Sequence, residues 1–326
     1  MATVAVGTQA GLQVRGTTDR ELLRGFLERD RLLAAYAICD LEDREFGRTR
    51  WGIATQGGEV VAIAMEYGGL TPQPMFVMGD NDGIAAILRD VVRPRAAYLA
   101  GPAPALSAVS QLYRVEPGPP MIRMWVDRTT FQPAPAQVER LLPVEVSELN
   151  RLYQLGFAAW LPSSAIAEGV YYGIRVNGRL VAAAGTHVIS RTARLAVVGN
   201  VLTHTDHRGR GYAKAVTSAV TAELLRYCDE VVLNVRSDNP PAIQAYTRLG
   251  FAEHARFEER LVRRLSSPWS DLTAPFRRFF ARSTAKPAPV PVIPDQARPH
   301  PNHQAHQVAV PTAAPSPDDG PLEDPR

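Results

Sequence analysis

Residues 194–213 read RLAVVGNVLTHTDHRGRGYA, and the fold that we expect of the 326-residue chain follows from them. Residues 194–203 form an apolar run that predicts a strand, and a turn with two glycines follows it. A helix of about four to five turns comes next, because apolar residues recur there at steps of three and four. These residues are Ala213, Val216, Val220, Leu224 and Tyr227.

The turn carries the groups that bind a phosphate. The first turn of a helix leaves four backbone N–H groups without partners at the positive end of the helix dipole. Gly209 and Gly211 have no β-carbon, so an anion can reach those amides. Arg208 and Arg210 alternate with the glycines and add positive charge. The alternative is that the glycines only shape a turn and that the arginines are solvated. The chain has neither the glycine–lysine loop of triphosphate sites nor the three-glycine dinucleotide fingerprint.

Two motifs make the prediction specific. Residues 208–213, RGRGYA, fit the pattern Gln/Arg-x-x-Gly-x-Gly/Ala, and residues 239–251, NPPAIQAYTRLGF, fit Asn-x-x-Ala-x-x-x-Tyr-x-x-x-Gly-Phe. Both resemble signatures of the GNAT superfamily of N-acetyltransferases, in the family's order and separated by a helix and a strand. The resemblance is close over about residues 137–265, and it extends to the first half only in layout.

The resemblance implies an acyl-CoA site in the second half. The pyrophosphate of acetyl-CoA, or of another short acyl-CoA, is expected on the turn, and the pantetheine along the preceding strand end, like an added β-strand. Asn239 is expected to contact the pantetheine amides, to cap the following helix, or both. The implied cofactor-binding residues are Val201, Leu202, Thr203, Arg208, Gly209, Arg210, Gly211, Tyr212, Ala213 and Asn239.

The implied reaction is direct attack of a primary amine on the thioester in a ternary complex, without a metal. Tyr246 stands at the motif's tyrosine position and is expected to stabilise charge on the departing sulfur, since a phenol with a pKa of about 10 is a poor acid toward a thiolate. Its alternative role is to pack the short helix onto the sheet. The general base stays open. Residues 194–203 include no carboxylate that could act as the base. His187 is expected to be a hydrogen-bonded structural residue, and a water relay could remove the proton equally well.

The chain repeats itself, which predicts its domain organisation. Residues 51–64 and 172–185 each predict a hairpin, and residues 104–112 and 241–249 each predict a short helix after a strand. The expected fold is α+β, an α/β three-layer arrangement on a mixed sheet, with two GNAT-like domains in tandem. We place a degenerate GNAT-like domain at 1–131, a linker at 132–137, the catalytic GNAT domain at 138–265, a basic aromatic segment at 266–286 and a disordered Pro-rich tail at 287–326.

The first half departs from the second where the chemistry is expected. Residues 79–83, GDNDG, are acidic where the other turn is basic, and Val109 stands in the place of Tyr246. Because an acidic turn repels a pyrophosphate, we expect this half not to bind acyl-CoA. Its expected role is to bury a face of the catalytic half and to shape the acceptor cleft.

Composition limits the cellular location and the binding partners that we expect for the protein. Cys39 and Cys228 are too few for a disulfide framework or a cysteine-based metal site. No apolar run suits a membrane helix and the first residues show no signal-peptide pattern, which predicts a cytoplasmic protein without membrane contacts. The basic charge near residues 256–286 favours a strand and a docked helix over a nucleic-acid surface. The expected partners are acyl-CoA and an amine of open identity, the oligomeric state stays open, and a non-catalytic acyl-CoA sensor or scaffold is the alternative function.

Overall fold

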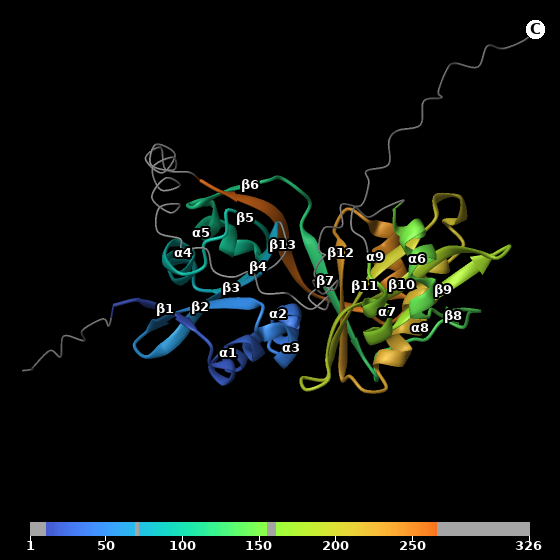
Figure 1. The fold of residues 1–326 in the computed structure, drawn as a ribbon, viewed down its shortest axis with the longest axis horizontal. Helices are drawn as coiled ribbons and strands as arrows, with labels where there is room; N and C mark the ends of the chain where they lie inside the picture. Colours follow the sequence, from blue (N-terminus) through green and yellow to red (C-terminus); the bar gives the residue numbers. More distant parts are fainter. Residues whose placement is uncertain (1–10, 69–71, 155–160, 266–326) are drawn as a thin grey trace, which may run out of the picture.

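The structure, a computed structural model, describes residues 11–68, 72–154 and 161–265. The described strands form one mixed sheet in the order β1-β2-β3-β4-β5-β13-β7-β12-β11-β10-β9-β8, and β6 pairs with β13 off this path. Figure 1 shows two lobes joined through the middle of that sheet, with most of the first half on the left. The predicted basic aromatic segment at 266–286 and the Pro-rich tail at 287–326 lie outside the described residues.

The first half follows the predicted order of hairpin, strand, helix, strand and helix, after a strand and a group of short helices. Its strands are β1 (Gln13–Thr17), β2 (Thr49–Gln56), β3 (Glu59–Tyr67), β4 (Gln73–Gly79), β5 (Ala96–Pro102), β6 (Tyr113–Val115) and β7 (Met121–Asp127). Its helices are α1 (Arg20–Leu27), α2 (Ala35–Cys39), α3 (Asp43–Phe46), α4 (Asn81–Asp90) and α5 (Leu106–Ser110). The hairpin is antiparallel and β4 runs parallel to β5.

The second half repeats this order. Its strands are β8 (Glu139–Arg140), β9 (Tyr171–Val176), β10 (Arg179–Ser190), β11 (Leu195–Thr203), β12 (Glu230–Arg236) and β13 (Ala252–Arg264). Its helices are α6 (Val146–Tyr153), α7 (Ser163–Glu168), α8 (Tyr212–Leu224) and α9 (Pro240–Thr247). The β9–β10 turn has positive φ at both Asn177 and Gly178, as a tight hairpin turn requires. β11 runs parallel to β12, so the repeat extends to strand direction.

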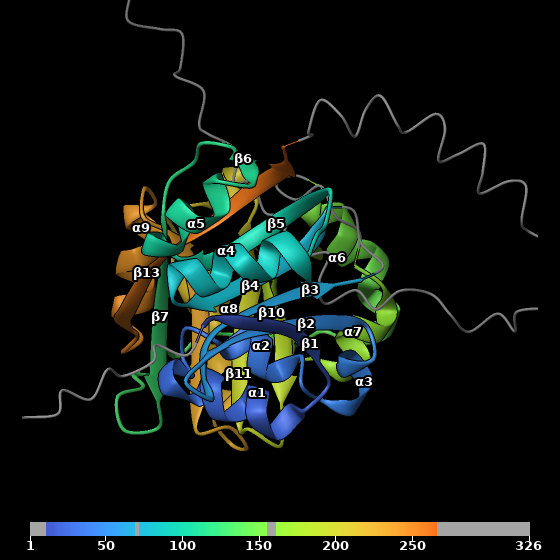
Figure 2. The ribbon, with the colours of Figure 1, turned by 90° about the vertical axis from the view of Figure 1, so that its left-hand side faces the viewer.

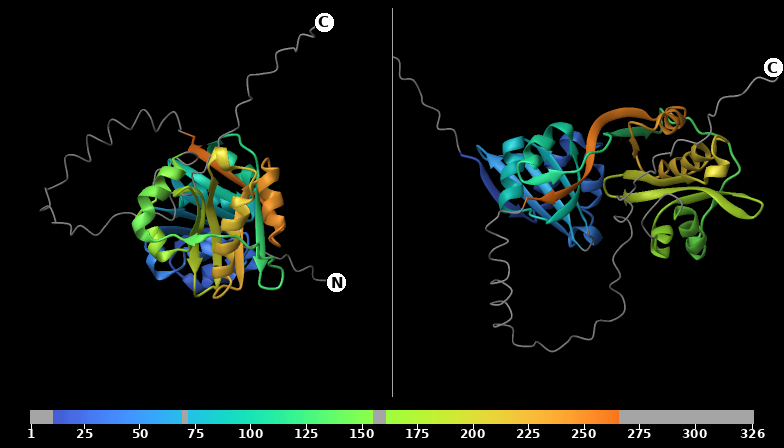
Figure 3. Two further views of the ribbon diagram at one scale, coloured as in Figure 1. Left: turned by 90° about the vertical axis from the view of Figure 1, so that its right-hand side faces the viewer. Right: turned by 90° about the horizontal axis from the view of Figure 1, so that it is seen from above.

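The last strands of the two halves are exchanged. β7, from the first half, pairs along its whole length with β12 of the second half. β13 pairs first with β7 and then, over residues 257–263, with β5 of the first half. In the right-hand view of Figure 3, β13 (orange) leaves the second lobe and crosses into the first. The predicted linker at 132–137 therefore separates the halves in sequence, but each half of the sheet is completed by a strand from the other.

Helices cover both faces of the sheet. Along β10, Ala182 and Ala184 join the apolar cluster that includes α8, whereas Ala183 joins the cluster that includes α6 and α7. This alternation follows from the two-residue period of a strand. The sheet thus lies between two helix layers, which confirms the predicted α+β three-layer class.

The two halves share part of their core. One cluster joins α1 and α2 of the first half to Val188, Val197 and Val232 of the second-half strands. In Figure 2, α1 and α2 lie in front of β10 and β11, and α2 contacts both strands. Each fully buried aliphatic side chain contributes roughly 1.5–3 kcal/mol, so this cluster ties the halves together. The first half therefore buries a face of the second, as the sequence predicts.

Candidate functional site

The parallel strands β11 and β12 part in the second half. Their pairing ends at Val198↔Leu233, although β11 continues to Thr203 and β12 to Arg236. A register shift against β10 lies at this point, where Asn200 adopts a φ of 52°. Such a bulge bends its strand. Of the predicted pantetheine-binding residues, Leu202 and Thr203 pair with β10, whereas Val201 lies within the register shift. Among the described strands, none pairs with the other edge of these three residues.

The predicted phosphate turn lies where the parted strand ends. His204 donates its backbone N–H to Val181 O at 2.8 Å, and a short 3-10 turn follows. Gly209 and Gly211 have φ of 76° and 79°, and no heavy atom lies within 4 Å of the position that a β-carbon would occupy at either. Gly211 is the N-cap of α8, and no side chain in the described part of the chain caps that helix. The first-turn amides are therefore uncapped by any described side chain, with open space at the two glycines beside them, as an anion site needs.

The remaining turn residues flank this opening. Arg208, Gly209, Arg210 and Gly211 are exposed, whereas Tyr212 and Ala213 begin α8 and are partly buried. Arg208 donates from Nε to Thr203 O over 3.4 Å, a long bond that keeps its guanidinium beside the turn. The structure thus brings together the predicted pantetheine strand and the predicted phosphate turn.

The two residues predicted from the second motif lie at α9, which follows β12, one of the two parted strands. Asn239 caps α9 by accepting a hydrogen bond from the Ala242 amide at 3.3 Å, which is one of its two predicted roles. Tyr246 lies on α9 with 7% of its surface exposed, and its ring centroid is 6.2 Å from that of Phe251. Burial raises the pKa of Tyr246 to about 12, so its phenol stays protonated at neutral pH.

The equivalent corner of the first half is closed. Asp80 caps α4 by accepting hydrogen bonds from the Asp82 and Gly83 amides, both at 3.0 Å. A β-carbon at Gly79 would lie 2.3 Å from Val61 O, and one at Gly101 would lie 2.7 Å from the Val77 side chain. The carboxylate thus holds the amides that an anion would need, which supports the prediction that this half does not bind acyl-CoA.

A set of polar side chains surrounds the parting on the face covered by α2. The Tyr36 hydroxyl lies 2.6 Å from His187 Nδ1, and His187 Nε2 lies 3.1 Å from Asn200 Oδ1. His187 is buried and packs its ring over Gly199, where a β-carbon would clash with it. Both ring nitrogens thus have partners, which agrees with the structural interpretation of this histidine. Tyr36 belongs to the first half, and no pattern in the sequence indicated its place here.

Three further polar residues lie on the other side of the parting, and sequence reasoning missed them. Asn234, the first β12 residue after the pairing with β11 ends, donates from Nδ2 to Glu259 Oε1 at 2.7 Å. Arg123 lies opposite Asn234 on β7, between the rings of Tyr36 and Phe257, at 5.4 and 4.9 Å from their centroids. Desolvation raises the pKa of Glu259 to about 7, against the opposing effects of Arg123, Arg260 and the Asn234 hydrogen bond. Glu259 belongs to the exchanged strand, so only the sheet order brings it here.

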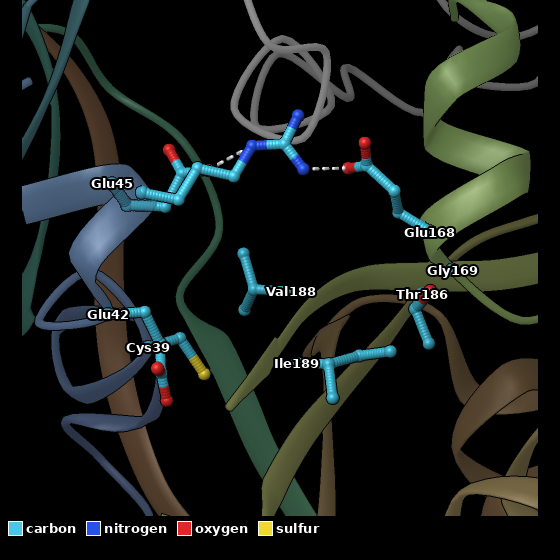
Figure 4. Close-up of a pocket in the computed structure, with 9 residues that line it drawn as sticks. Cys39, Glu42, Glu45, Glu168, Gly169, Thr186, Val188 and Ile189 are labelled. Atoms are coloured by element: carbon cyan, nitrogen blue, oxygen red, sulfur yellow. Dashed lines mark ion pairs between the residues drawn. The ribbon is translucent and has the colours of Figure 1, made fainter. Parts of the chain in front are cut away.

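A pocket of about 160 Å³ lies between the halves, at the part of β10 that faces the still paired residues of β11. Figure 4 shows Cys39, Glu42 and Glu45 of the first half facing Glu168, Thr186 and Val188 of the second. An ion pair between Arg44 and Glu168, at 2.5 Å, bridges the two sides. Three carboxylates against one guanidinium make this lining acidic, so it favours cations over anions.

The described residues show no metal centre. Within residues 11–68, 72–154 and 161–265, no three His, Cys, Asp or Glu side chains gather as a metal ion requires, and both cysteines are free and buried. In the same ranges, no helix has the length and apolar character needed to cross a membrane.

The match to a known protein family lies in the half of the chain that contains this candidate site. Residues 138–251 match the model of the acetyltransferase (GNAT) family. A GCN5-related N-acetyltransferase from Sphaerobacter thermophilus aligns at 18% identity with a TM-score of 0.54, over 77% of this chain and 95% of that one. A Drosophila protein aligns at 13% identity with a TM-score of 0.58, over 78% and 99% of the two chains. A tandem GNAT protein from the clavulanic acid biosynthesis pathway aligns at 15% identity with a TM-score of 0.48, over 79% and 99%. No curated protein sequence matches the chain.

Proposed function

The chain belongs to the GNAT superfamily of acetyltransferases, and from that premise we propose that it transfers an acetyl or other short acyl group from acyl-CoA to a primary amine. One observation carries the proposal. The unpaired edge of β11 leads, through the glycine turn at 204–211, into a helix N-terminus that no described side chain caps and beside which the two glycines leave open space. An extended thioester arm and a pyrophosphate need these two features in this order.

The binding residues act together in this proposal. Gly209 and Gly211 leave room for phosphate oxygens at the amides of Tyr212 and Ala213, and Arg208 and Arg210 add charge from the exposed side. Val201, Leu202 and Thr203 pair through their backbone with the pantetheine arm. Asn239, besides capping α9 in the loop after β12, contacts that arm in this proposal. Each group contributes about 0.3–1 kcal/mol, so binding needs several of them at once.

Tyr246 acts on the sulfur in this proposal. The amine forms a bond to the thioester carbonyl carbon, the C–S bond breaks, and its electron pair moves to sulfur. A phenol that stays protonated at neutral pH can donate a hydrogen bond to that developing thiolate. Its buried place on α9 keeps the hydroxyl in a water-poor environment, where such a bond is stronger. We place the protein in the cytoplasm, with acyl-CoA and an amine as its partners and no metal in the reaction.

Titration calorimetry with acetyl-CoA tests the cofactor, and thiol release with a panel of primary amines tests the reaction. We expect binding of acetyl-CoA to the full chain and faster thiol release with at least one amine. No heat at millimolar acetyl-CoA would overturn the proposal. Binding without amine-dependent thiol release would favour the second candidate, a non-catalytic acyl-CoA sensor or scaffold. The absence of a carboxylate from 194–203 is the observation that favours this candidate.

A further inference from the structure

We propose that Glu259, on the exchanged strand β13, is the general base that takes the proton from the acceptor amine. This inference rests on the proposed acyltransfer. It fills the position that the sequence left open, since β11 has no carboxylate of its own. The base then comes from a strand that completes the first half of the sheet, not from the strand that binds the thioester.

The position of the carboxylate carries the inference. Glu259 pairs in register with Ala100 of β5, yet its Oε1 accepts a hydrogen bond from Asn234 of β12 at 2.7 Å. The side chain therefore extends from β13 toward β12, past the beginning of β7. Asn234 immediately follows Leu233, the last β12 residue that pairs with β11. The hydrogen bond thus holds the carboxylate where the two strands begin to part, beside the expected path of the thioester.

The environment leaves the carboxylate able to accept a proton. Asn234 engages Oε1, and no other described side chain donates a hydrogen bond to Glu259. No arginine, lysine or histidine among the described residues lies within ion-pair distance of it. Glu259 is only partly buried, as are Asn234 and Tyr36, so its carboxylate is not closed off from solvent.

Charged and titratable groups approach Glu259 from each neighbouring element. They are Arg123 from β7, Tyr36 from α2, Tyr98 from β5 and Arg260 on β13 itself. The arginines favour the carboxylate form, whereas desolvation favours the acid form, and desolvation is the larger effect. The pKa of about 7 that results is close to the value at which a general base works best near neutral pH.

The proposed reaction moves a proton from the amine to Glu259 as the acyl group is transferred. The amine nitrogen bonds to the carbonyl carbon, and its proton goes to the Glu259 carboxylate. The C–S bond breaks with its electron pair on sulfur, and the thiolate takes a proton from water beside the Tyr246 hydroxyl. Glu259 then returns its proton to solvent, so the net products are an amide and the free thiol.

Glu259→Gln tests the inference, because glutamine keeps the shape and the hydrogen bond to Asn234 but does not accept the proton. The assay follows thiol release from acetyl-CoA with lysine, spermidine, tyramine and glucosamine, and the fastest amine serves for a pH profile. We expect kcat/KM of the wild type to rise with pH through about 7, because the base must be deprotonated. The variant is expected to lose about a hundredfold in kcat and to lose this acid limb, with acetyl-CoA binding by calorimetry unchanged.

Glu253→Gln is the matched control, since Glu253 lies on the same strand and is exposed, and its side chain forms an ion pair only with Arg256 among the described residues. It should leave the pH profile unchanged. An infrared titration of the protein without amine gives a readout independent of turnover. The C=O stretch of a protonated carboxylic acid should disappear as the pH rises through about 7 in the wild type and should be missing from Glu259→Gln.

The outcomes separate the two proposals. No thiol release from the wild type with any amine overturns the acyltransfer and the inference with it. An active wild type whose pH profile and infrared titration are unchanged by Glu259→Gln overturns the inference alone. A variant with a lowered melting temperature and weakened acetyl-CoA binding makes Glu259 a structural residue and also overturns it.

Discussion

The two halves of this protein build the same corner and close it differently. In the first half, one residue, Asp80, separates β4 from α4, and its side chain occupies the helix amides. In the second half, residues 204–211 separate β11 from α8, and glycines leave the amides open. Strand, helix and sheet direction are shared. The phosphate site that we propose therefore depends on the inserted turn and not on the fold alone.

The glycines of the two corners show the same contrast. Gly79 has a φ of 113°, and Val61 O lies too close to it for any β-carbon, so this glycine allows close packing. Gly211 has a φ of 79° with nothing near it, so its role is to leave room. A positive φ therefore marks a tight site in one half and an open site in the other.

Gly211→Val should give the largest effect. Valine is strained at positive φ by roughly 1–3 kcal/mol, and its methyl groups obstruct the amides. We expect acetyl-CoA affinity to fall about a hundredfold in calorimetry, with the circular dichroism spectrum retained. Gly178→Val is the matched control, because Gly178 has a φ of 76° and open surroundings at a hairpin far along the chain. Equal losses of affinity in both variants would mean that strain, and not access, explains the result.

Tyr246→Phe should lower kcat about tenfold and leave acetyl-CoA affinity nearly unchanged. The removed hydroxyl would stabilise only the charge on the departing sulfur, and a hydrogen bond to a charged group contributes about 1.5–3 kcal/mol. Thiol-release kinetics and calorimetry measure the two quantities. Tyr227→Phe, on the same side of the sheet, is the control and should change neither. A parallel loss of affinity in Tyr246→Phe would indicate that the ring only packs α9 onto the sheet.

Replacing Arg208 and Arg210 together by alanine should weaken acetyl-CoA binding about fivefold. Both side chains are exposed, and an exposed ionic contact contributes about 0.2–1 kcal/mol. The difference in affinity between the variant and the wild type should shrink as the salt concentration rises from about 50 to about 500 mM. Over that range the Debye length falls about threefold, so exposed charges are screened more strongly. An unchanged affinity at low salt would show that the arginines are solvated and that the amides bind alone.

Asp80→Ala should give the smallest effect on ligand binding, namely none, and a modest effect on stability. Loss of an N-cap costs about 0.5–2 kcal/mol, measured here by urea unfolding. Acetyl-CoA affinity and stoichiometry should match the wild type, since Gly79 and Gly101 leave no room beside the freed amides. A second equivalent of bound acetyl-CoA would show that the carboxylate alone had closed this corner.

Sequence patterns predicted local features well. The repeat of hairpin, strand and helix appears in both halves. The helix predicted after Gly211 begins at Tyr212 but ends at Leu224, so its 13 residues form fewer turns than the predicted four to five and exclude Tyr227. Such features depend on residues close together in the chain, through hydrophobic period, glycine content and capping. The open turn and the Asn239 cap were predictable for the same reason.

The strand exchange was not predictable in this way. Any apolar strand of suitable length could pair with β5 or β12, so the identity of the partner depends on the whole sheet. The site residues that depend on that choice, Arg123 and Glu259, were therefore missed, as was Tyr36, which reaches the second half only because α2 packs on β10 and β11. The predicted binding residues and domain limits remain predictions, and the Gly211, Arg208 and Arg210 variants test the phosphate turn among them.

The exchange also affects how a newly made chain acquires its structure. When residue 131 leaves the ribosome, β5 has no neighbour on one side, because the strand that pairs there, β13, is more than a hundred residues from being synthesised. β7 is already made, but its partner β12 is not. Long-range pairing of this kind slows folding and leaves strand edges exposed meanwhile. A translation product truncated before β13 would therefore retain two incomplete sheets rather than one finished domain, and would be a natural target for chaperones or proteases.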